Sequence, residues 1–331
     1  MGFAELHLHL EGTLEPELAF ALAERNKIVL PWRDPDELRG RYDYGCLQDF
    51  LDLYYANMAV LRTEADFAEL TDAYLARAAR AGVVRAEVFL DLQAHTARGV
   101  PAAVVLAGVS DALGSSQADH GVSSGLIVTF LRHLSAADAE HAYDEAVASG
   151  VDLLGIGLCS SEVGFPAAPF APLWARARAD GLHTVAHAGE EGDAGYVWEV
   201  LRELKVERVD HGIRALEDPT LVAHLAEHRI PLTACPLSNV KLKAVTELAA
   251  HPLPVMLDAG LVVTVNSDDP AYFGGYLDDN LTAVRRAFNL TDAQVRTLEA
   301  NSIEAAFVST DEKARLLAKV SSSGEGSTTR H

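Results

Sequence analysis

The sequence predicts an α/β fold, a (β/α)8 barrel with extra helices near its N-terminus, because eight short apolar segments alternate with longer segments of helical periodicity. The short segments are nearly continuous in apolar residues, as is typical of parallel strands that are covered on both faces. With 331 residues, 49% of them hydrophobic, the chain is long enough to bury the core of such a barrel.

The expected strands are short and β-branched or apolar in character. They lie at residues 4–9, 84–90, 126–132, 153–158, 183–188, 208–211, 230–235 and 262–266. Eight such units fit a closed barrel better than an open sheet.

The segments between the expected strands show helical signals. Residues 64–81 carry apolar side chains three and four positions apart, and Gly82 follows as a C-terminal cap. Helices are also expected at residues 135–149, at residues 219–227 and after the capping-box sequence of Thr291 and Gln294. Residues 15–57 are too long for one crossover, so they predict extra helices over the mouth of the barrel.

The chain shows no change of composition that would mark an internal linker. We therefore predict one catalytic domain at residues 1–318 and a flexible Ser/Gly-rich tail at residues 319–331.

Charge and composition limit the classes of partner. The net charge of −21 argues against binding nucleic acid through a basic face, and no apolar run approaches the ~18 residues of a membrane span. Three widely separated cysteines without a CxxC pair indicate reduced thiols in the cytoplasm. Assembly into a homo-oligomer is left open.

Histidines and acids gather where the expected strands end, which is the end of a barrel that carries catalytic groups. His7 and His9 point to the same side of the first strand, since side chains alternate along a strand. The fifth strand ends at His187, and Glu190 follows three residues later. An HxH pair on a surface strand is common by chance, so it is a weak signal by itself.

The sixth and eighth strands add more candidates. His211 ends the sixth strand before Gly212, and the acids Asp268 and Asp269 follow the eighth. A turn before Pro270 would explain either acid alone. Two acids beside an apolar strand are costly to bury unless a partner such as a metal offsets the charge.

Taken together, these residues predict a single zinc site. Imidazoles with one carboxylate suit Zn²⁺, and the ligands would be His7, His9, His187 and Asp268, with one ion per chain. Iron or manganese would fit the same ligands. Glu190 and His211 remain as acid and base candidates, and Asp269 as a substrate contact.

Five motifs in order along residues 4–310 resemble those of the adenosine/adenine deaminase family of zinc metallohydrolases, whose fold is a TIM barrel. They are HLHLEG (7–12), HAGEEG (187–192), DHG (210–212), CPLSN (235–239) and SDDP (267–270). The resemblance implies hydrolytic deamination of a purine. By this resemblance Glu190 protonates purine N1, His211 takes a proton from the attacking water and Asp269 bonds N7.

The branch of the family that this chain resembles most is the bacterial and fungal adenine deaminases. Glu11 stands where adenosine-cleaving members have Asp, and its longer side chain is expected to occupy the place of a ribose. Cys159 departs from the pattern of the branch, which has GLDSSE where this chain has GLCSSE. That position should border N3 of the purine, so Cys159 bears on substrate preference.

Three alternatives remain beside adenine deamination in purine salvage. The first is a deaminase of another 6-aminopurine, such as adenosine, an N6-substituted adenine or an aminonucleoside derivative. The second is an inactive binding protein, which has no need of a general acid. The third is an ester or amide hydrolase with two metals, which would use a bridging lysine on the fourth strand. No lysine lies between Val83 and Leu204.

Overall fold

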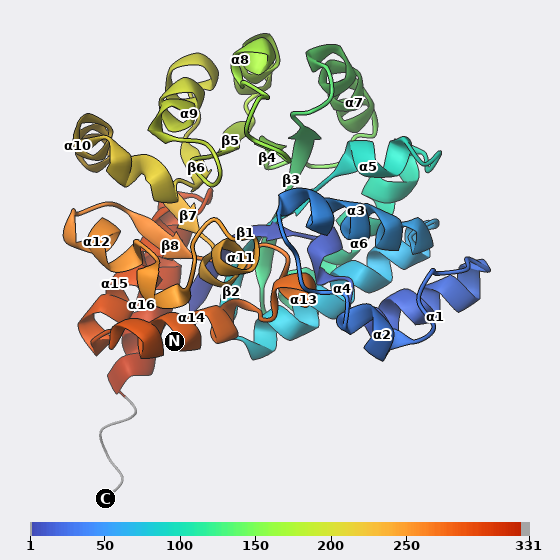
Figure 1. Ribbon diagram of the computed structural model, residues 1–331, viewed down its shortest axis with the longest axis horizontal. Coiled ribbons are helices and arrows are strands. Elements are labelled where there is room, and N and C mark those ends of the chain that lie inside the picture. Colours follow the sequence, from blue (N-terminus) through green and yellow to red (C-terminus); the bar gives the residue numbers. More distant parts are fainter. Residues whose placement is uncertain (1, 326–331) are drawn as a thin grey trace, which may run out of the picture.

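The computed structural model describes residues 2–325 and has a parallel barrel at its centre (Figure 1). Eight strands follow one another in sequence order around the sheet. They are β1 (Phe3–His9), β2 (Val83–Leu90), β3 (Ser123–Leu131), β4 (Gly155–Cys159), β5 (His183–Ala188), β6 (Arg208–His211), β7 (Leu232–Ala234) and β8 (Val263–Val265). The predicted fold class is confirmed, and every expected strand segment contains a strand.

The backbone of Asp268 joins the end of the last strand to the first strand by hydrogen bonds. Leu8 of β1 forms a bridge with Asp268, three residues beyond β8. The N–H of His9 donates to the carbonyl of Asp268 at 3.0 Å, and the N–H of Asp268 donates to the carbonyl of His7 at 3.1 Å. The seam of the barrel therefore coincides with three residues that the sequence marks as metal ligands.

Charged side chains of two strands, β2 and β6, pair with one another in the buried part of the barrel. Glu87 accepts a hydrogen bond from Arg208 at 2.6 Å and another from the backbone N–H of Phe307 at 2.6 Å, and Arg85 lies 3.4 Å away. Glu87 and Arg208 are fully buried, and a buried charge needs such a partner.

One set of helices surrounds the sheet (Figure 1). They are α4 (Glu64–Arg80), α6 (Ala102–Asp119), α7 (Ala136–Ala148), α8 (Ala171–Ala179), α9 (Ala194–Glu199) with the π-helical segment η4 (Val200–Leu204), α10 (Pro219–His228), α12 (Leu253–Asp258), α14 (Leu277–Phe288), α15 (Asp292–Glu304) and α16 (Thr310–Glu325). The helices predicted at 64–81, 135–149 and 219–227 are present, and Thr291 and Gln294 form the predicted capping box of α15.

A second set of helices follows the carboxyl ends of strands or connects the outer helices. They are η1 (Glu11–Thr13), α1 (Pro16–Asn26), α2 (Pro35–Arg39), α3 (Leu47–Asn57), η2 (Met58–Val60), α5 (Leu92–Thr96), η3 (Ala168–Phe170), η5 (Ile213–Glu217), α11 (Pro236–Lys241), η6 (Leu248–Ala250) and α13 (Pro270–Phe273). The extra helices predicted within residues 15–57 are thus α1, α2 and α3. Phe50 and Tyr54 of α3 pack on Tyr272 of α13 and also line the pocket.

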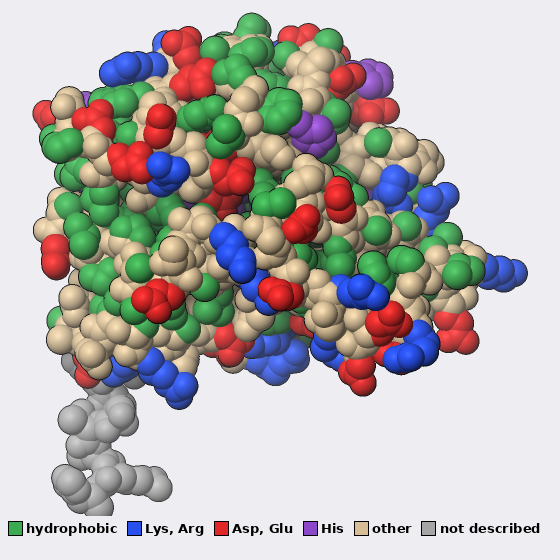
Figure 2. Space-filling view, in the orientation of Figure 1, with side chains coloured by type: hydrophobic (Ala, Val, Ile, Leu, Met, Phe, Trp, Pro, Cys, Tyr) green, Lys and Arg blue, Asp and Glu red, His purple; other side chains and the backbone are tan. Residues whose placement is uncertain are grey.

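The last described helix, α16, runs through the boundary predicted at residue 318. Residues 319–325 have helical backbone, and residues 326–331 of the predicted tail lie outside the described residues. Within residues 2–325, no helix has both the length and the apolar character needed to cross a membrane. Figure 2 shows Lys and Arg side chains scattered among Asp and Glu on one face, without a continuous basic surface.

Candidate active site

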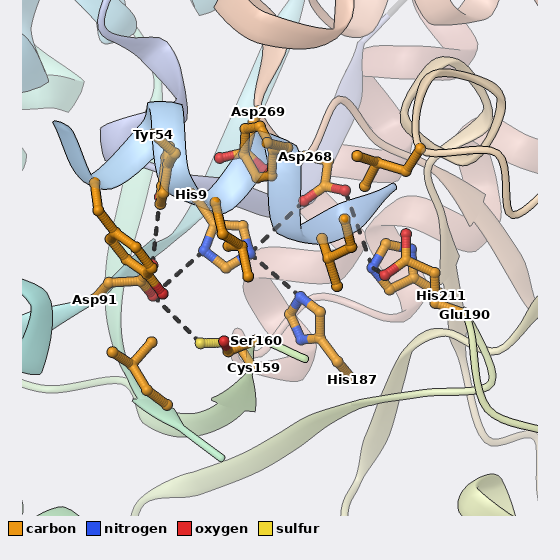
Figure 3. A pocket seen from close by; sticks show the side chains of 16 residues that line it. His9, Tyr54, Asp91, Cys159, Ser160, His187, Glu190, His211, Asp268 and Asp269 are labelled. Atoms are coloured by element: carbon orange, nitrogen blue, oxygen red, sulfur yellow. Dashed lines mark hydrogen bonds and ion pairs between the residues drawn. The ribbon is translucent and has the colours of Figure 1, made fainter. Parts of the chain in front are cut away.

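A pocket lies at the carboxyl ends of the barrel strands, and Figure 3 shows its lining from close by. The strand ends contribute His9, Asp91, Cys159, His187, His211, Asp268 and Asp269, and the turn after β5 adds Glu190. Apolar and aromatic side chains of α3 cover one side, with Leu242 beside them. The pocket thus combines a polar floor with an apolar wall, as expected for a small-molecule site.

Four buried side chains converge at one point of this pocket. The ring nitrogens of His7, His9 and His187 and a carboxylate oxygen of Asp268 all lie within 4.8 Å of one another. Asp268 Oδ1 is 3.3 Å from His7 Nε2 and 3.7 Å from His9 Nε2. Ser238 donates to the other oxygen, Oδ2, at 2.7 Å. The structure therefore brings together all four residues that the sequence marked as ligands.

Each of the three histidines has a second ring nitrogen, Nδ1. The groups near Nδ1 indicate which nitrogen of each ring is free for a metal. His9 Nδ1 faces a carboxylate oxygen of Asp91 at 3.5 Å, and His187 Nδ1 faces one of Asp210 at 3.4 Å. Both contacts are ion-pair distances and not hydrogen bonds, and a proton on each Nδ1 would face a carboxylate that can only accept it. Thr233 donates its hydroxyl hydrogen to Asp210 at 3.1 Å, so it accepts from His7 Nδ1 at 2.9 Å.

With these protons on Nδ1, all three Nε2 atoms present lone pairs toward the same point. The Nε2 atoms of His9 and His187 are only 3.2 Å apart, a separation at which either one nitrogen donates to the other or both can bind one cation. His7 Nε2 is buried and has no hydrogen-bond partner among the described residues. Histidines whose second nitrogen bonds a carboxylate are the usual metal-binding arrangement, so this donor set fits a metal ion.

A second group, His7, His211, Cys235 and Asp268, also has the spacing for a metal. Burial, together with the charge of Asp268, raises the pKa of the Cys235 thiol well above its ordinary value. Cys235 also lies 3.5 Å from the carbonyl of Thr233, which accepts from the thiol. A protonated thiol is a poor ligand, so we favour the set that contains His9 and His187.

Glu190 and His211 face each other beside the ligand group, 3.5 Å apart between Oε2 and Nε2. Asn239 Nδ2 lies 3.3 Å from Glu190 Oε1 and 3.4 Å from His211 Nδ1. Burial, with the charge of Asp268, raises the pKa of Glu190 well above its usual range. Burial also lowers the pKa of His211 well below its usual range. The pocket thus favours a protonated carboxyl group beside a neutral imidazole.

Asp269 lines the pocket, and its Oδ1 is buried without a partner among the described residues. Burial, followed by the charge of Asp268, raises its pKa well above the ordinary value. A Cβ on Gly12 would meet Asp269 Oδ1 at 2.2 Å, so η1 reaches this carboxyl group only because residue 12 is glycine.

Glu11, expected at the place of a ribose, does not line the pocket. Its Oε1 accepts from His95 Nε2 at 2.7 Å and from the backbone N–H of Asp91 at 3.0 Å. His95 is fully buried and receives a hydrogen bond from Arg98 on its other nitrogen at 2.6 Å. These bonds hold the Glu11 carboxylate, so its contact with substrate stays a prediction.

Three residues at this end of the barrel have left-handed backbone conformations without being glycine. They are His211 and Asp268, both at φ 63°, and Ser160 at φ 77°. Such conformations are uncommon for these residue types and concentrate at functional sites. The two residues at φ 63° are among those that carry the chemistry predicted from the sequence.

Sequence reasoning missed several polar residues of the site. Asp91 follows β2 directly, so the rule that catalytic groups follow barrel strands could have found it. Asp91 also accepts from Thr129 at 2.6 Å, from Cys159 at 3.4 Å and from Tyr54 at 3.3 Å. Asn239 belongs to the CPLSN motif, but the sequence predicts no role for it. No local signal predicted the contacts of Glu162, which are described below.

Comparison with known proteins gives consistent results. Residues 3–323 match the model of the adenosine deaminase family. An adenine deaminase of Streptomyces coelicolor is 57% identical over 319 residues, which cover 96% of this chain and 94% of that protein. The crystal structure of adenine deaminase from Arthrobacter aurescens superposes with a TM-score of 0.97 at 53% identity, covering 98% and 99% of the two chains. An amidohydrolase from B. ambifaria with bound Zn gives 0.90 at 28% identity, covering 98% and 91%.

Proposed function

Because this chain belongs to the adenosine deaminase family, we propose that it is a hydrolase that deaminates adenine to hypoxanthine and ammonia. Relatives that carry the name adenine deaminase, at 57% and 53% identity over nearly the whole chain, support adenine as the substrate. Such a reaction belongs to purine salvage. The observation that carries the proposal is the 3.5 Å approach of Glu190 to His211 beside the convergent ligand group, in surroundings that raise the pKa of Glu190 and lower that of His211.

The proposed metal is one Zn²⁺ per chain, held by His7, His9, His187 and Asp268. Three imidazoles with one carboxylate suit zinc, and the amidohydrolase with bound Zn supports this choice. When bound, zinc makes water a nucleophile at neutral pH by lowering its pKa to about 7.

The chain's own residues would then direct the proton transfers. Glu190 donates its proton to N1 of the purine, which makes C6 electrophilic. His211 accepts a proton from the attacking water, as the family resemblance implies, and can return it to the leaving amino group. Asp269 donates a hydrogen bond to N7. As the oxygen of water adds to C6 and ammonia leaves, the proton of the new C6 hydroxyl group passes to the ionised Glu190, so adenine and water give hypoxanthine and ammonia and both residues return to their starting states.

The test is to incubate the zinc-loaded protein separately with adenine, adenosine and N6-methyladenine and follow the ultraviolet change as the amine becomes an oxo group. We expect rapid turnover of adenine, little turnover of adenosine, and a loss of about 10²–10⁴-fold in E190Q. No turnover of adenine by protein with one zinc bound would overturn the proposal. Turnover of N6-methyladenine alone would move the assignment to a modified purine.

The cellular location is proposed from the state of the cysteines. Cys46, Cys159 and Cys235 are all free, which supports a reducing, cytoplasmic location. The proposed partner is a small purine. Reactivity of the exposed Cys46 with a thiol reagent, measured in fresh cell lysate, would check the reduced state.

A further inference from the structure

The turn that carries Glu190 wraps around a buried carboxylate from another part of the chain. Glu162, three residues beyond β4, accepts hydrogen bonds from four consecutive backbone N–H groups. Oε1 accepts from Gly189 at 2.6 Å, and Oε2 accepts from Glu190 at 3.1 Å, Glu191 at 2.9 Å and Gly192 at 2.8 Å. Glu162 is 3% exposed, so these bonds are shielded from water.

Consecutive N–H groups that point to one centre form an anion-binding concavity, which in many proteins holds a phosphate. Here the anion is part of the protein. Hydrogen bonds to a charged acceptor are roughly twice as strong as neutral ones, and a buried N–H left without an acceptor destabilises the fold. Gly189, at φ +72°, allows the bend, and a Cβ on Gly192 would lie 2.8 Å from Glu162 Oε1. The turn is therefore shaped around this carboxylate.

Arg132, which follows a third strand, β3, holds the beginning of the same turn by a hydrogen bond. Arg132, at the end of β3, donates from Nη1 to the carbonyl of His187 at 2.9 Å and from Nε to the carbonyl of Phe165 at 2.8 Å. His187 belongs to the ligand group, and Glu190 follows it by three residues. Arg132 and Glu162 thus fix the backbone on both sides of Glu190.

We propose that Glu162 is a positioning residue that holds the carboxyl group of Glu190 in place for proton donation. The Glu190 side chain itself has few direct contacts, namely Asn239 at 3.3 Å and His211 at 3.5 Å. Its position depends mainly on where the backbone of the turn lies. This inference rests on the proposed role of Glu190 as the acid, and a displacement of about 1 Å can cost ~10²-fold in rate.

The first test compares E162Q with E191Q. The amide introduced by E162Q would offer one acceptor oxygen and turn an NH₂ group toward N–H donors. The side chain of Glu191 forms no hydrogen bond or ion pair among the described residues, so E191Q changes charge beside the turn without removing a hydrogen bond. With zinc content matched, we expect E162Q to lose about 10²-fold in kcat with KM changed less than ~3-fold, and E191Q to stay within ~3-fold of wild type. A wild-type kcat in E162Q would overturn the proposal. If E162Q does not fold, E162D, which retracts the oxygens by one methylene, is expected to lose about 10-fold in kcat, and an unchanged kcat in E162D would overturn it as well.

The second test separates positioning from a general structural role. If Glu162 acts through Glu190, then adding E162Q to E190Q should cost less than ~3-fold further in kcat, because the two residues act as a unit. A full additional loss of about 10²-fold in the double variant would overturn the proposal.

The third test needs no substrate. Amide hydrogen exchange of residues 189–192 should be faster in E162Q than in wild type and unchanged in E191Q. Equal exchange in E162Q and wild type would overturn the proposal even if adenine proved not to be the substrate. A zinc-loaded wild type that leaves adenine intact while E162Q exchanges faster would instead reject only the proposed function.

Discussion

The three histidines at the carboxyl ends of β1 and β5 suit the proposed metal site because the second nitrogen of each ring faces a polar side chain. Asp210, Asp91 and Thr233 fix which nitrogen of each ring carries its proton. Burial alone would raise the pKa of Asp210, but its contact with His187 and the charge of His7 lower it to about 2. Asp210 is therefore an anion throughout the neutral range.

We expect Asp210→Asn to weaken zinc binding by about 10–100-fold, because the amide removes the charge that supports the His187 ring. Competition with a chelator of known affinity measures the change. Asp152→Asn, at an exposed position, serves as the matched control. Equal zinc affinity in both variants would show that Asp210 does not tune the ligand.

His251 is a buried histidine that the structure keeps neutral. The N–H of Leu253 donates to its Nδ1 at 3.1 Å, so Nε2 carries the proton and donates to Asn239 Oδ1 at 3.2 Å. Asn239 consequently turns its NH₂ group toward Glu190 and His211. Burial lowers the pKa of His251 from 6.5 to about 4. Protonation would break the bond from Leu253 and place a charge in an apolar region.

The consequence is a pH-dependent stability with a defined sign. Between pH 4 and 6.5 the unfolded state binds more protons at this site than the folded state, so stability falls as the pH falls. The loss amounts to about 3 kcal/mol when the pH reaches 4. Urea unfolding of wild type and His251→Gln at several pH values measures it, and we expect a flatter dependence in the variant. His141→Gln, on the exposed face of α7, should keep the wild-type slope. A wild-type slope in His251→Gln would contradict the assignment.

At the scale of elements, the short helix η1 is placed against Asp269 through Gly12. We expect Gly12→Ala to lower stability by about 1–3 kcal/mol and to reduce kcat/KM for adenine, because the added methyl group displaces η1 or Asp269. Thermal unfolding and steady-state kinetics measure the two effects. In α6, Gly114→Ala is the control, since nothing lies within 4 Å of its Cβ, and it should stabilise the helix by about 0.5–1 kcal/mol. Unchanged kinetics in Gly12→Ala would show that Asp269 tolerates displacement.

The strands were predictable because buried parallel strands are apolar along their length, and the convergence of the four proposed ligands was predictable because they lie at the ends of such strands. The residues at which strands begin and end were harder to predict from the sequence. Residues 230–235 contain only a three-residue strand, Leu232–Ala234, because pairing with β6 and β8 limits it, and sequence does not show pairing. The partners of Glu11 and Glu162 were not predictable either. Glu11 bonds His95, 84 residues away, and Glu162 bonds N–H groups, which every residue but proline possesses.

At the scale of the whole molecule, the metal would contribute to stability as well as to chemistry. Three of the four proposed ligands lie at the seam between β1 and β8. A ligand that binds only the folded state adds about 4 kcal/mol at a thousand times its Kd. We therefore expect chelation to lower the Tm and to speed amide exchange at the seam more than elsewhere, with zinc restoring both. An identical Tm after measured loss of the metal would contradict this coupling.

The same seam sets the order in which the protein can become active during its synthesis. His7 and His9 leave the ribosome well before Asp268, which follows His9 by 259 positions. At about 5–20 residues per second, roughly 13–50 s separate the two ends of the site. A nascent chain that stops before β8 has three of the ligands and no closed barrel. The protein can therefore become catalytically active only late in its synthesis, when the last strand docks beside the first.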